Sequence, residues 1–98
     1  MFTGTLAVDL LLGDVHSLKQ KRSVVRPIIA QLKRVCDVAA AEAGHADLHR
    51  RALIGVAIVA TDAAQCERVL TSAVRLVEDH PEITVLSTRQ RVYALEDE

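Results

Sequence analysis

The sequence predicts an α+β domain of the ferredoxin-like type, in which two helices cover one face of a four-stranded antiparallel sheet. Residues 18–35 and 61–80 repeat their apolar positions with the period of an amphipathic helix. Four other segments are rich in β-branched or small apolar residues and are bounded by turn residues. The resulting order, β-α-β-β-α-β, is that of the split βαβ arrangement and predicts a single domain over residues 1–98.

The first strand and the first helix follow from the residue pattern. Residues 2–12 alternate in character, which is typical of a strand with one better-buried face. The Ser17 hydroxyl can then cap a helix that runs from Leu18 to about Val35. Pro27 lies inside this helix, but the periodicity continues across it, so one kinked helix is expected. A basic stripe lies beside the apolar face, formed by Lys19, Arg22, Arg26 and Lys33.

The middle of the chain is predicted to form an edge strand and then a central strand. The alanines of 36–44 also fit a helix, but the preceding helix is already long and Gly44 closes the segment, so a short edge strand is expected. Residues 50–60 follow, and they are apolar on both faces between Leu53 and Val59. This pattern is typical of a central strand that is covered on both sides.

The last helix and the last strand have clear boundary signals. Thr61 or Asp62 can cap the second helix, and Gln65 lies three residues after Asp62, as in a capping box. Pro81 ends this helix, and residues 83–95 form a final strand whose Thr, Arg and Gln residues mark it as partly exposed. In this topology the first and third strands occupy the centre of the sheet.

Composition argues against several classes of function. The 12 basic and 13 acidic residues nearly cancel, so the chain lacks the positive charge of a typical DNA-binding domain and no DNA partner is expected. Phe2 and Tyr93 are the only aromatic residues, which disfavours base stacking. No apolar run reaches the ~20 residues needed to cross a bilayer, and two cysteines are too few for a disulfide framework. A cytoplasmic protein without membrane contact is therefore expected.

The hexapeptide SLKQKR, residues 17–22, is the strongest candidate for a binding surface. In the predicted topology the start of the first helix, the loop before the third strand and the end of the second helix meet at one end of the domain. Cations at a helix N-terminus oppose the helix dipole, which favours a bound anion nearby. They also fit a solvated turn paired with local acids, which is the commoner arrangement. Besides the helix cap Ser17, the candidate anion- or RNA-binding residues are Lys19, Lys21, Arg22, Arg26, Arg50 and Arg51.

Lys21 differs from the other cations of this end. Its position on the helical wheel falls within the apolar face, so its ammonium group is expected to snorkel past the edge of the sheet. The opposite end of the domain is expected to hold Asp37, Asp62 and the acidic residues 96–98. A nearly neutral protein is thus expected to be polarised.

The sequence contains no recognisable catalytic or metal-binding motif. His45, Asp47 and His49 alternate in one loop, but nothing is placed to complete a metal shell, so a polar loop is favoured and no metal is expected. Cys36 and Cys66 could form a redox pair, although two buried thiols are the favoured interpretation. Glycine-rich phosphate loops and nucleophile elbows are absent, so no catalytic residue and no cofactor are assigned, and a non-enzymatic role is favoured.

The uncovered face of the sheet predicts an interface. The helices cover one face only, yet the first and third strands are apolar on both, which exposes residues such as Leu11, Leu53 and Val59 in a monomer. A homodimer formed through the open sheet face or through an edge strand is the simplest cover.

Several stretches of the chain resemble one known family. SLKQKR and VVRPI in the first helix, DVAAAEAG at 37–44 and RALIGVAIVATD at 51–62 are similar to the YlxP-like family of small bacterial proteins, domain of unknown function 503. The resemblance covers nearly the whole chain. It implies a ferredoxin-like fold and a cytoplasmic bacterial protein without an established biochemical activity. It also implies a gene that often lies beside those of translation initiation and ribosome maturation factors.

These observations together predict a non-enzymatic accessory factor that contacts ribosomal RNA or a ribosome-associated partner through its basic end. Charge reversal at Lys19, Lys21 and Arg22 is expected to abolish such binding while the fold survives. The alternative is a regulatory or binding module for a small anionic, phosphate-bearing ligand at the same end or in the dimer interface.

Overall fold

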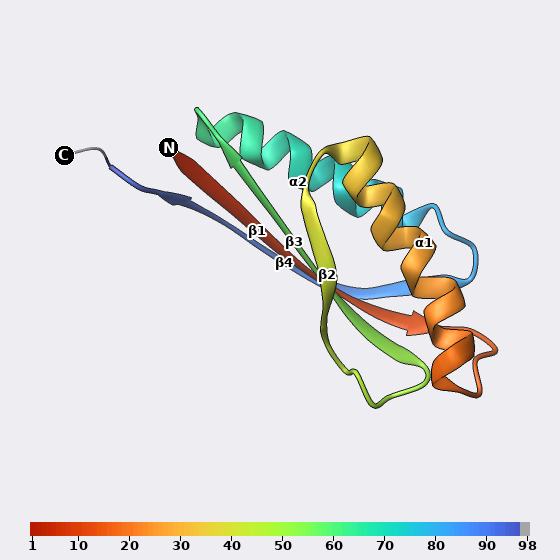
Figure 1. Cartoon of the computed structure of the whole chain (residues 1–98). Helices are drawn as coiled ribbons and strands as arrows, with labels where there is room; N and C mark the ends of the chain where they lie inside the picture. The colour runs from red at the N-terminus through yellow and green to blue at the C-terminus, as the bar shows by residue number, and fades with distance from the viewer. Residues whose placement is uncertain (97–98) are drawn as a thin grey trace.

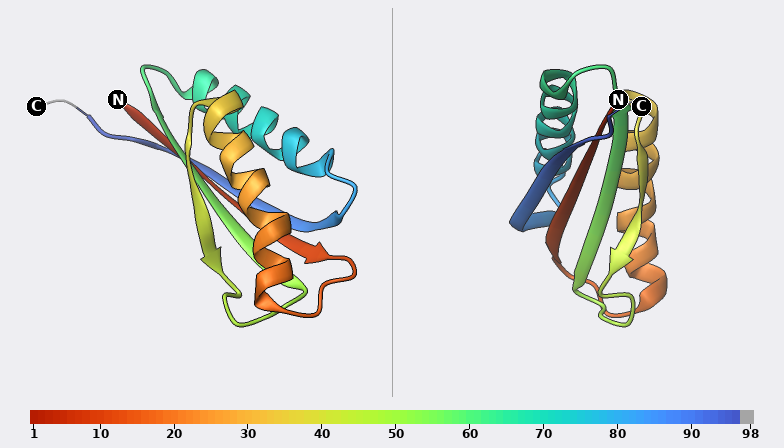
Figure 2. Two further views of the ribbon diagram at one scale, coloured as in Figure 1. Left: turned by 45° about the vertical axis from the view of Figure 1, so that its right-hand side comes forward. Right: turned by 90° about the vertical axis from the view of Figure 1, so that its left-hand side faces the viewer.

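The computed structural model describes residues 1–96 and has the ferredoxin-like α+β fold that the sequence predicts. Four strands form one antiparallel sheet in the order β2-β3-β1-β4, so the first and third strands are central. Both helices lie on one side of this sheet, which leaves the other side as an open face (Figure 2). The predicted acidic C-terminus falls partly on Asp97 and Glu98, which lie outside the described residues. The elements shown in Figure 1 are β1 (Phe2–Leu12), α1 (Leu18–Cys36), β2 (Ala39–Gly44), β3 (Arg51–Ala60), α2 (Ala63–Glu78) and β4 (Ile83–Ala94).

The hydrophobic core lies between the helices and the sheet. Val8, Leu10 and Leu12 of β1 are completely buried, whereas the residues between them lie on the open face. Full burial of one such side chain stabilises the fold by roughly 1.5–3 kcal/mol. Every second side chain of the strand and every third or fourth side chain of each helix therefore point into one shared apolar layer. The helices contribute Val25, Ile28, Leu32, Leu70, Ala73 and Val77 to it.

Helix α1 has the predicted start and a less expected end. The backbone N–H of Gln20 donates to the Ser17 hydroxyl at 3.1 Å, which confirms the predicted cap. The helix runs through Pro27 as a single element and ends at Cys36. Asp37 then adopts a left-handed conformation with a φ of 56°, which turns the chain back toward the sheet. The edge strand consequently begins at Ala39, three residues later than the sequence suggests.

Among the described residues, Lys21 is the one charged side chain that the core encloses. It is 2% exposed, and its Nζ donates to the His45 carbonyl oxygen at 2.7 Å and lies 2.7 Å from Glu42 Oε2. The sequence placed Lys21 correctly on the apolar face, but the expectation that it snorkels into solvent is wrong. Glu42 pairs with Ile54 in the sheet register and so faces the helices, where it meets the ammonium group inside the protein.

The Asp62 carboxylate caps α2 by accepting the Gln65 backbone N–H at 2.7 Å, so one of the two predicted caps is confirmed.

Gly4 permits the close contact between β1 and α2. A Cβ atom added at Gly4 would lie 3.0 Å from Leu70 Cδ1 and 3.2 Å from Cys66 Cβ, both on α2. The helix therefore packs directly against the strand at this point.

Replacement of Lys21 tests the buried ion pair. Lys21→Met keeps the aliphatic stem but leaves Glu42 without its partner, and removal of one member of a buried pair costs roughly 3–5 kcal/mol. Since the Glu42 side chain is 29% exposed and can be partly hydrated, we expect a loss near the lower end of that range in the free energy of unfolding. Urea denaturation measures it.

A double-mutant cycle and an exposed neighbour serve as controls. In the Glu42→Gln background, Lys21→Met should cost at least ~1 kcal/mol less than in the wild type, because a neutral amide has already replaced the carboxylate and no buried charge is left unpaired. Lys19→Met, on the exposed side of the same turn, should change stability by less than about 0.5 kcal/mol. Equal effects of Lys21→Met and Lys19→Met would contradict the burial of Lys21.

Gly4→Ala should destabilise the protein by about 1–3 kcal/mol, because the added methyl group overpacks the β1–α2 contact. Gly13→Ala is the matched control: the nearest atom to its added Cβ is the Glu82 carbonyl oxygen at 3.5 Å, an ordinary contact. Thermal unfolding of the two variants under identical conditions makes the comparison. A Gly4→Ala variant as stable as Gly13→Ala would show that α2 is free to shift outward.

Candidate nucleic-acid interface

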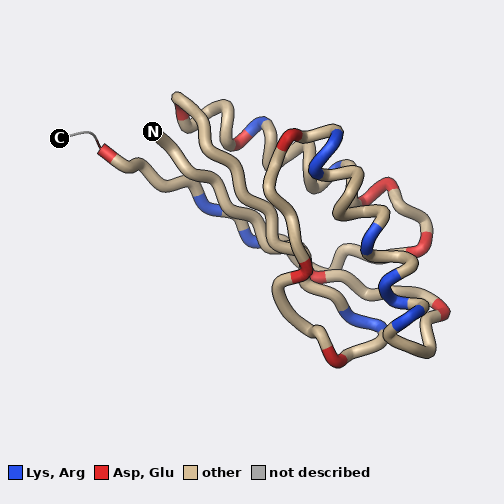
Figure 3. Tube along the Cα trace, viewed as in Figure 1, with Lys and Arg blue, Asp and Glu red and all other residues tan. Residues whose placement is uncertain are grey.

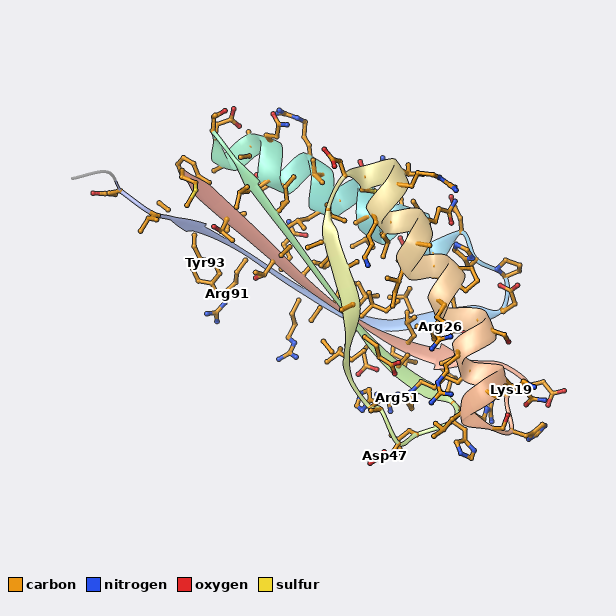
Figure 4. The ribbon with its side chains drawn as sticks, viewed as in Figure 1. Lys19, Arg26, Asp47, Arg51, Arg91 and Tyr93 are labelled. Atoms are coloured by element: carbon orange, nitrogen blue, oxygen red, sulfur yellow. The ribbon has the colours of Figure 1, made fainter. Side chains whose placement is uncertain are left out.

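The structure divides the six predicted cations into two groups. Three of them, Lys21, Arg50 and Arg51, are engaged in contacts within the protein. The other three lie exposed on α1, and no ion pair holds them within residues 1–96; they are Lys19, Arg22 and Arg26. Figure 4 shows Lys19 and Arg26 on the helix and Arg51 on the sheet.

Arg51 forms a bidentate ion pair with Asp9. Its Nη2 lies 2.8 Å from both carboxylate oxygens, and its Nε donates to Asp9 Oδ1 at 3.3 Å. The two residues are diagonal neighbours across the β1–β3 pair, because Asp9 is the register partner of Leu53 and Arg51 is the register partner of Leu11. The hydrogen bonds from Arg51 hold the pKa of Asp9 below its ordinary value, against the opposing effect of burial, and the His45 ring at 3.4 Å acts in the same direction as Arg51.

Arg50 ties the loops of the basic end together. Its Nε donates to the Leu12 and Gly13 carbonyl oxygens at 3.2 and 2.9 Å, and its own carbonyl accepts the Leu12 N–H at 2.8 Å. The Gly13 N–H in turn donates to the Glu82 carbonyl at 3.1 Å. The predicted convergence of the β1–α1, β2–β3 and α2–β4 loops is thus confirmed. Arg50 contributes to it through backbone contacts.

The histidine loop is a turn and not the extended segment considered from the sequence. His45 has a φ of 58°, and its carbonyl oxygen accepts the Leu48 N–H at 3.0 Å. This turn directs the His45 carbonyl toward Lys21 and the His45 ring toward Asp9. Across the part of the chain that the structure describes, no three metal-ligating side chains gather into a cluster.

The two cysteines are free thiols in apolar surroundings. Cys66 lies in the first turn of α2 and is completely buried, and Cys36 is half-buried at the end of α1. Burial raises the pKa of the Cys36 thiol, which lowers its thiolate fraction at neutral pH. Both features agree with thiols that behave as small apolar side chains.

The exposed cations form a continuous surface along α1, here called the α1 stripe. At 100° per residue, four of its members fall within a sector of about 60° around the helix: Lys19, Arg22, Arg26 and Lys33. A rise of 1.5 Å per residue gives these four a span of about 21 Å along the helix axis. The 19-residue helix carries no Asp or Glu at all. Figure 3 shows basic residues spaced along its whole length. The α1 stripe comprises Lys19, Arg22, Arg26, Lys33 and Arg34, all exposed.

Lys33 and Arg34 are members that the sequence did not single out as site residues. The helical period was sufficient to place Lys33 beside Arg26. The site expected from the sequence was centred on the converging loops, whereas Lys33 and Arg34 lie in the last turn of α1, far from the SLKQKR stretch. The exposed cationic surface therefore runs along the helix and is not confined to its first turn.

Arg51→Gln should raise the pKa of Asp9, because it removes the hydrogen bonds that lower it. A depressed folded-state pKa stabilises the fold above the unfolded-state value, and this stabilisation is lost as the pH falls through the folded-state pKa. The variant should therefore lose less stability on acidification than the wild type. NMR titration of the Asp9 carboxyl group measures the shift, and Arg50→Gln, which does not touch Asp9, is the control. An unchanged Asp9 pKa in Arg51→Gln would contradict the assigned cause.

Comparison with known proteins gives the chain a family but no activity. Residues 3–90 match the model of the family described as protein of unknown function DUF503. The uncharacterized protein YlxP of Bacillus subtilis (strain 168) is 29% identical over 86 residues, which cover 88% of this chain and 94% of that protein. No helix within residues 1–96 combines the length and apolar character needed to cross a membrane.

Two solved structures share the fold at low sequence identity. The de novo designed protein Foldit4 has a TM-score of 0.56 at 12% identity, over 98% of this chain and all of that one (100%). A variant of SnoaB, a cofactor-independent oxygenase from Streptomyces nogalater, has a TM-score of 0.53 at 10% identity, over 98% and 95% of the two chains. Such identities support the fold alone. The resemblance seen in the sequence is confirmed by the family match, and the chain belongs to the DUF503 family.

Proposed function

We propose that the protein is a non-enzymatic accessory factor that binds structured RNA, such as ribosomal RNA, through the α1 stripe. The observation that carries this proposal is the charge of one helix: α1 has six basic residues and no acidic ones, and five of the six are exposed. The sixth, Lys21, is neutralised by Glu42. Nothing on the helix itself therefore offsets the positive field of the stripe.

The arrangement of the stripe suits a phosphate backbone. A cation that contacts a phosphate releases condensed counterions, and this effect supplies most of the sequence-independent affinity for nucleic acids. Structured RNA is recognised largely by its shape and by contacts with phosphates and 2′-hydroxyls, for which lysine and arginine suffice. The overall charge of −1 does not oppose this. At physiological ionic strength charges more than about 8 Å apart are largely screened, so the local field of the stripe decides.

The alternative function, binding of a small anionic ligand at the basic end, stays a prediction. The structure gives Lys21 and Arg51 carboxylate partners within the protein, which removes two of the cations on which this alternative relies. The expected homodimer also stays a prediction. β2 and β4 are the edge strands through which it would form if the open face were not used.

Neutralisation of two stripe residues should weaken RNA binding in a salt-dependent way. For Arg22→Gln/Arg26→Gln we expect the slope of log K against log salt to become less steep by about 1–2, because each lost phosphate contact removes close to one released counterion. Fluorescence anisotropy with a labelled ribosomal RNA hairpin, between 50 and 200 mM salt, measures the slope. Lys21 is left intact, since its replacement would confound binding with unfolding.

The matched control removes the same charge from the neighbouring helix. Arg68 and Arg75 of α2 are both exposed, so Arg68→Gln/Arg75→Gln has the same net charge as the stripe variant. The control should keep a slope close to that of the wild type. Equal slopes for the two double variants would show that binding follows net charge, and the proposal that α1 is the binding surface would be wrong.

A further inference from the structure

A second polar surface lies on the open face of the sheet, at the C-terminal part of β4. Arg89, Arg91 and Tyr93 occupy alternate positions of this strand and pair in register with Ala7, Thr5 and Thr3 of β1. Their side chains therefore project from the same face. Figure 4 shows Arg91 and Tyr93 on the side of the sheet away from the helices. We call these three residues the open-face patch; Tyr93 is 49% exposed, and both arginines are exposed as well.

The patch borders a flat floor of small residues. Its side chains line a hollow of about 470 Å³ together with Thr5 and Ala7. Thr5 and Leu6 also line a neighbouring hollow of about 400 Å³, whose other walls are Gly55 and the alanine and valine residues of β2 and β3. Both hollows are shallow because no large side chain rises from the floor between them. A planar ring can therefore lie against the strands, with Tyr93 and the arginines at its side.

The charge of this face favours an anionic occupant over a second copy of the chain. Among the described strand residues, the only carboxylate on the open face is Asp9, and Arg51 already binds both of its oxygens. Arg89 and Arg91 belong to none of the ion pairs found in residues 1–96. Face-to-face packing of two copies would bury four arginines without free carboxylates, which is unfavourable.

We propose that the open-face patch binds single-stranded nucleic acid, with a base stacked on the Tyr93 ring and neighbouring phosphates on Arg89 and Arg91. Residues two apart in a strand are about 6.8 Å apart, so the two arginines can follow an extended phosphate backbone. Few aromatic residues disfavour extended base stacking by this chain, but one ring beside a basic groove provides a single stacking position, and such rings bind single strands without sequence preference. A duplex would hide its bases from Tyr93. The patch lies on a different surface from the α1 stripe, so this proposal stands without the proposed function.

Tyr93 reports on this site directly, because the chain contains one tyrosine and no tryptophan. A 12-nucleotide oligouridylate should quench the intrinsic tyrosine emission saturably as a base stacks on the ring. The α1 variant Arg22→Gln/Arg26→Gln should show the same maximal quenching. Absence of quenching at saturation would overturn the proposal. UMP at the same nucleotide concentration should quench much less, and equal quenching would show a mononucleotide site and overturn the polymer assignment.

Anisotropy of the labelled oligouridylate tests the individual side chains. Arg89→Gln/Arg91→Gln should weaken binding about tenfold or more at 50 mM salt. Tyr93→Ala should weaken it at least fivefold, whereas Tyr93→Phe, which keeps the ring, should bind within about twofold of the wild type. Equal losses for Tyr93→Ala and Tyr93→Phe, or a larger loss for Arg22→Gln/Arg26→Gln than for the β4 pair, would contradict the assignment.

Sedimentation velocity separates this site from a dimer interface. The wild type and Arg89→Gln/Arg91→Gln should have the same oligomeric state, because the patch meets nucleic acid and not a second chain. The wild type could instead be a dimer whose stability Arg89→Gln/Arg91→Gln changes, either by converting it to a monomer or by tightening it. Either result would assign the face to a second copy and overturn the proposal.

Discussion

The bond between Lys21 and the end of β2 determines how the helical layer attaches to the edge of the sheet. β2 has the sequence AAAEAG, so it offers α1 little apolar surface, and of its alanines only Ala40 is buried. The ammonium group compensates by reaching two places at once, the Glu42 carboxylate on the strand and the His45 carbonyl in the turn after it. A methionine or leucine at this position would fill the space but hold neither partner in place.

Lys21 shares the buried face of α1 with Val25, Ile28 and Leu32, and this face fixes the rotation of the helix about its axis. With Lys21 pointing into the core, Lys19 and Arg22 must point outward, and the helical period carries that orientation on to Arg26 and Lys33. The left-handed turn at His45 extends the network through the loop to Asp9 and Arg51 on the open face. One short motif thus combines an internal anchor, Lys21, with an external cationic surface that begins at Lys19 and Arg22.

The sequence was sufficient for the elements and their order but not for the partners of the charged residues. Periodicity and caps predicted both helices and all four strands, because each depends on local residue pattern. The start of β2 was missed because a left-handed aspartate at residue 37 gives no local signal. The partners of Lys21 and Arg51 are 21 and 42 positions away, and their meeting depends on strand register, including the bulge between Glu42 and Gly44.

For the open-face patch, the sequence shows which side chains lie on one face of the strand but not which face of the sheet that is. The alternation of Arg89, Arg91 and Tyr93 is legible in the sequence, and so is their sharing of one face. Which face they share is not legible, because β4 shifts register by one residue against β1 between Asp9 and Leu10. Without that bulge the three side chains would point toward the helices.

The register shift therefore leaves the protein with cationic surfaces on both of its layers. An RNA that presents a folded part to α1 and a single-stranded flank to β4 would engage both, and weak contacts would add through their shared chain. A small molecule or a compact anion can reach only one of them. The two proposals taken together therefore predict an extended polyanion, which can span both surfaces, in preference to a single small ligand.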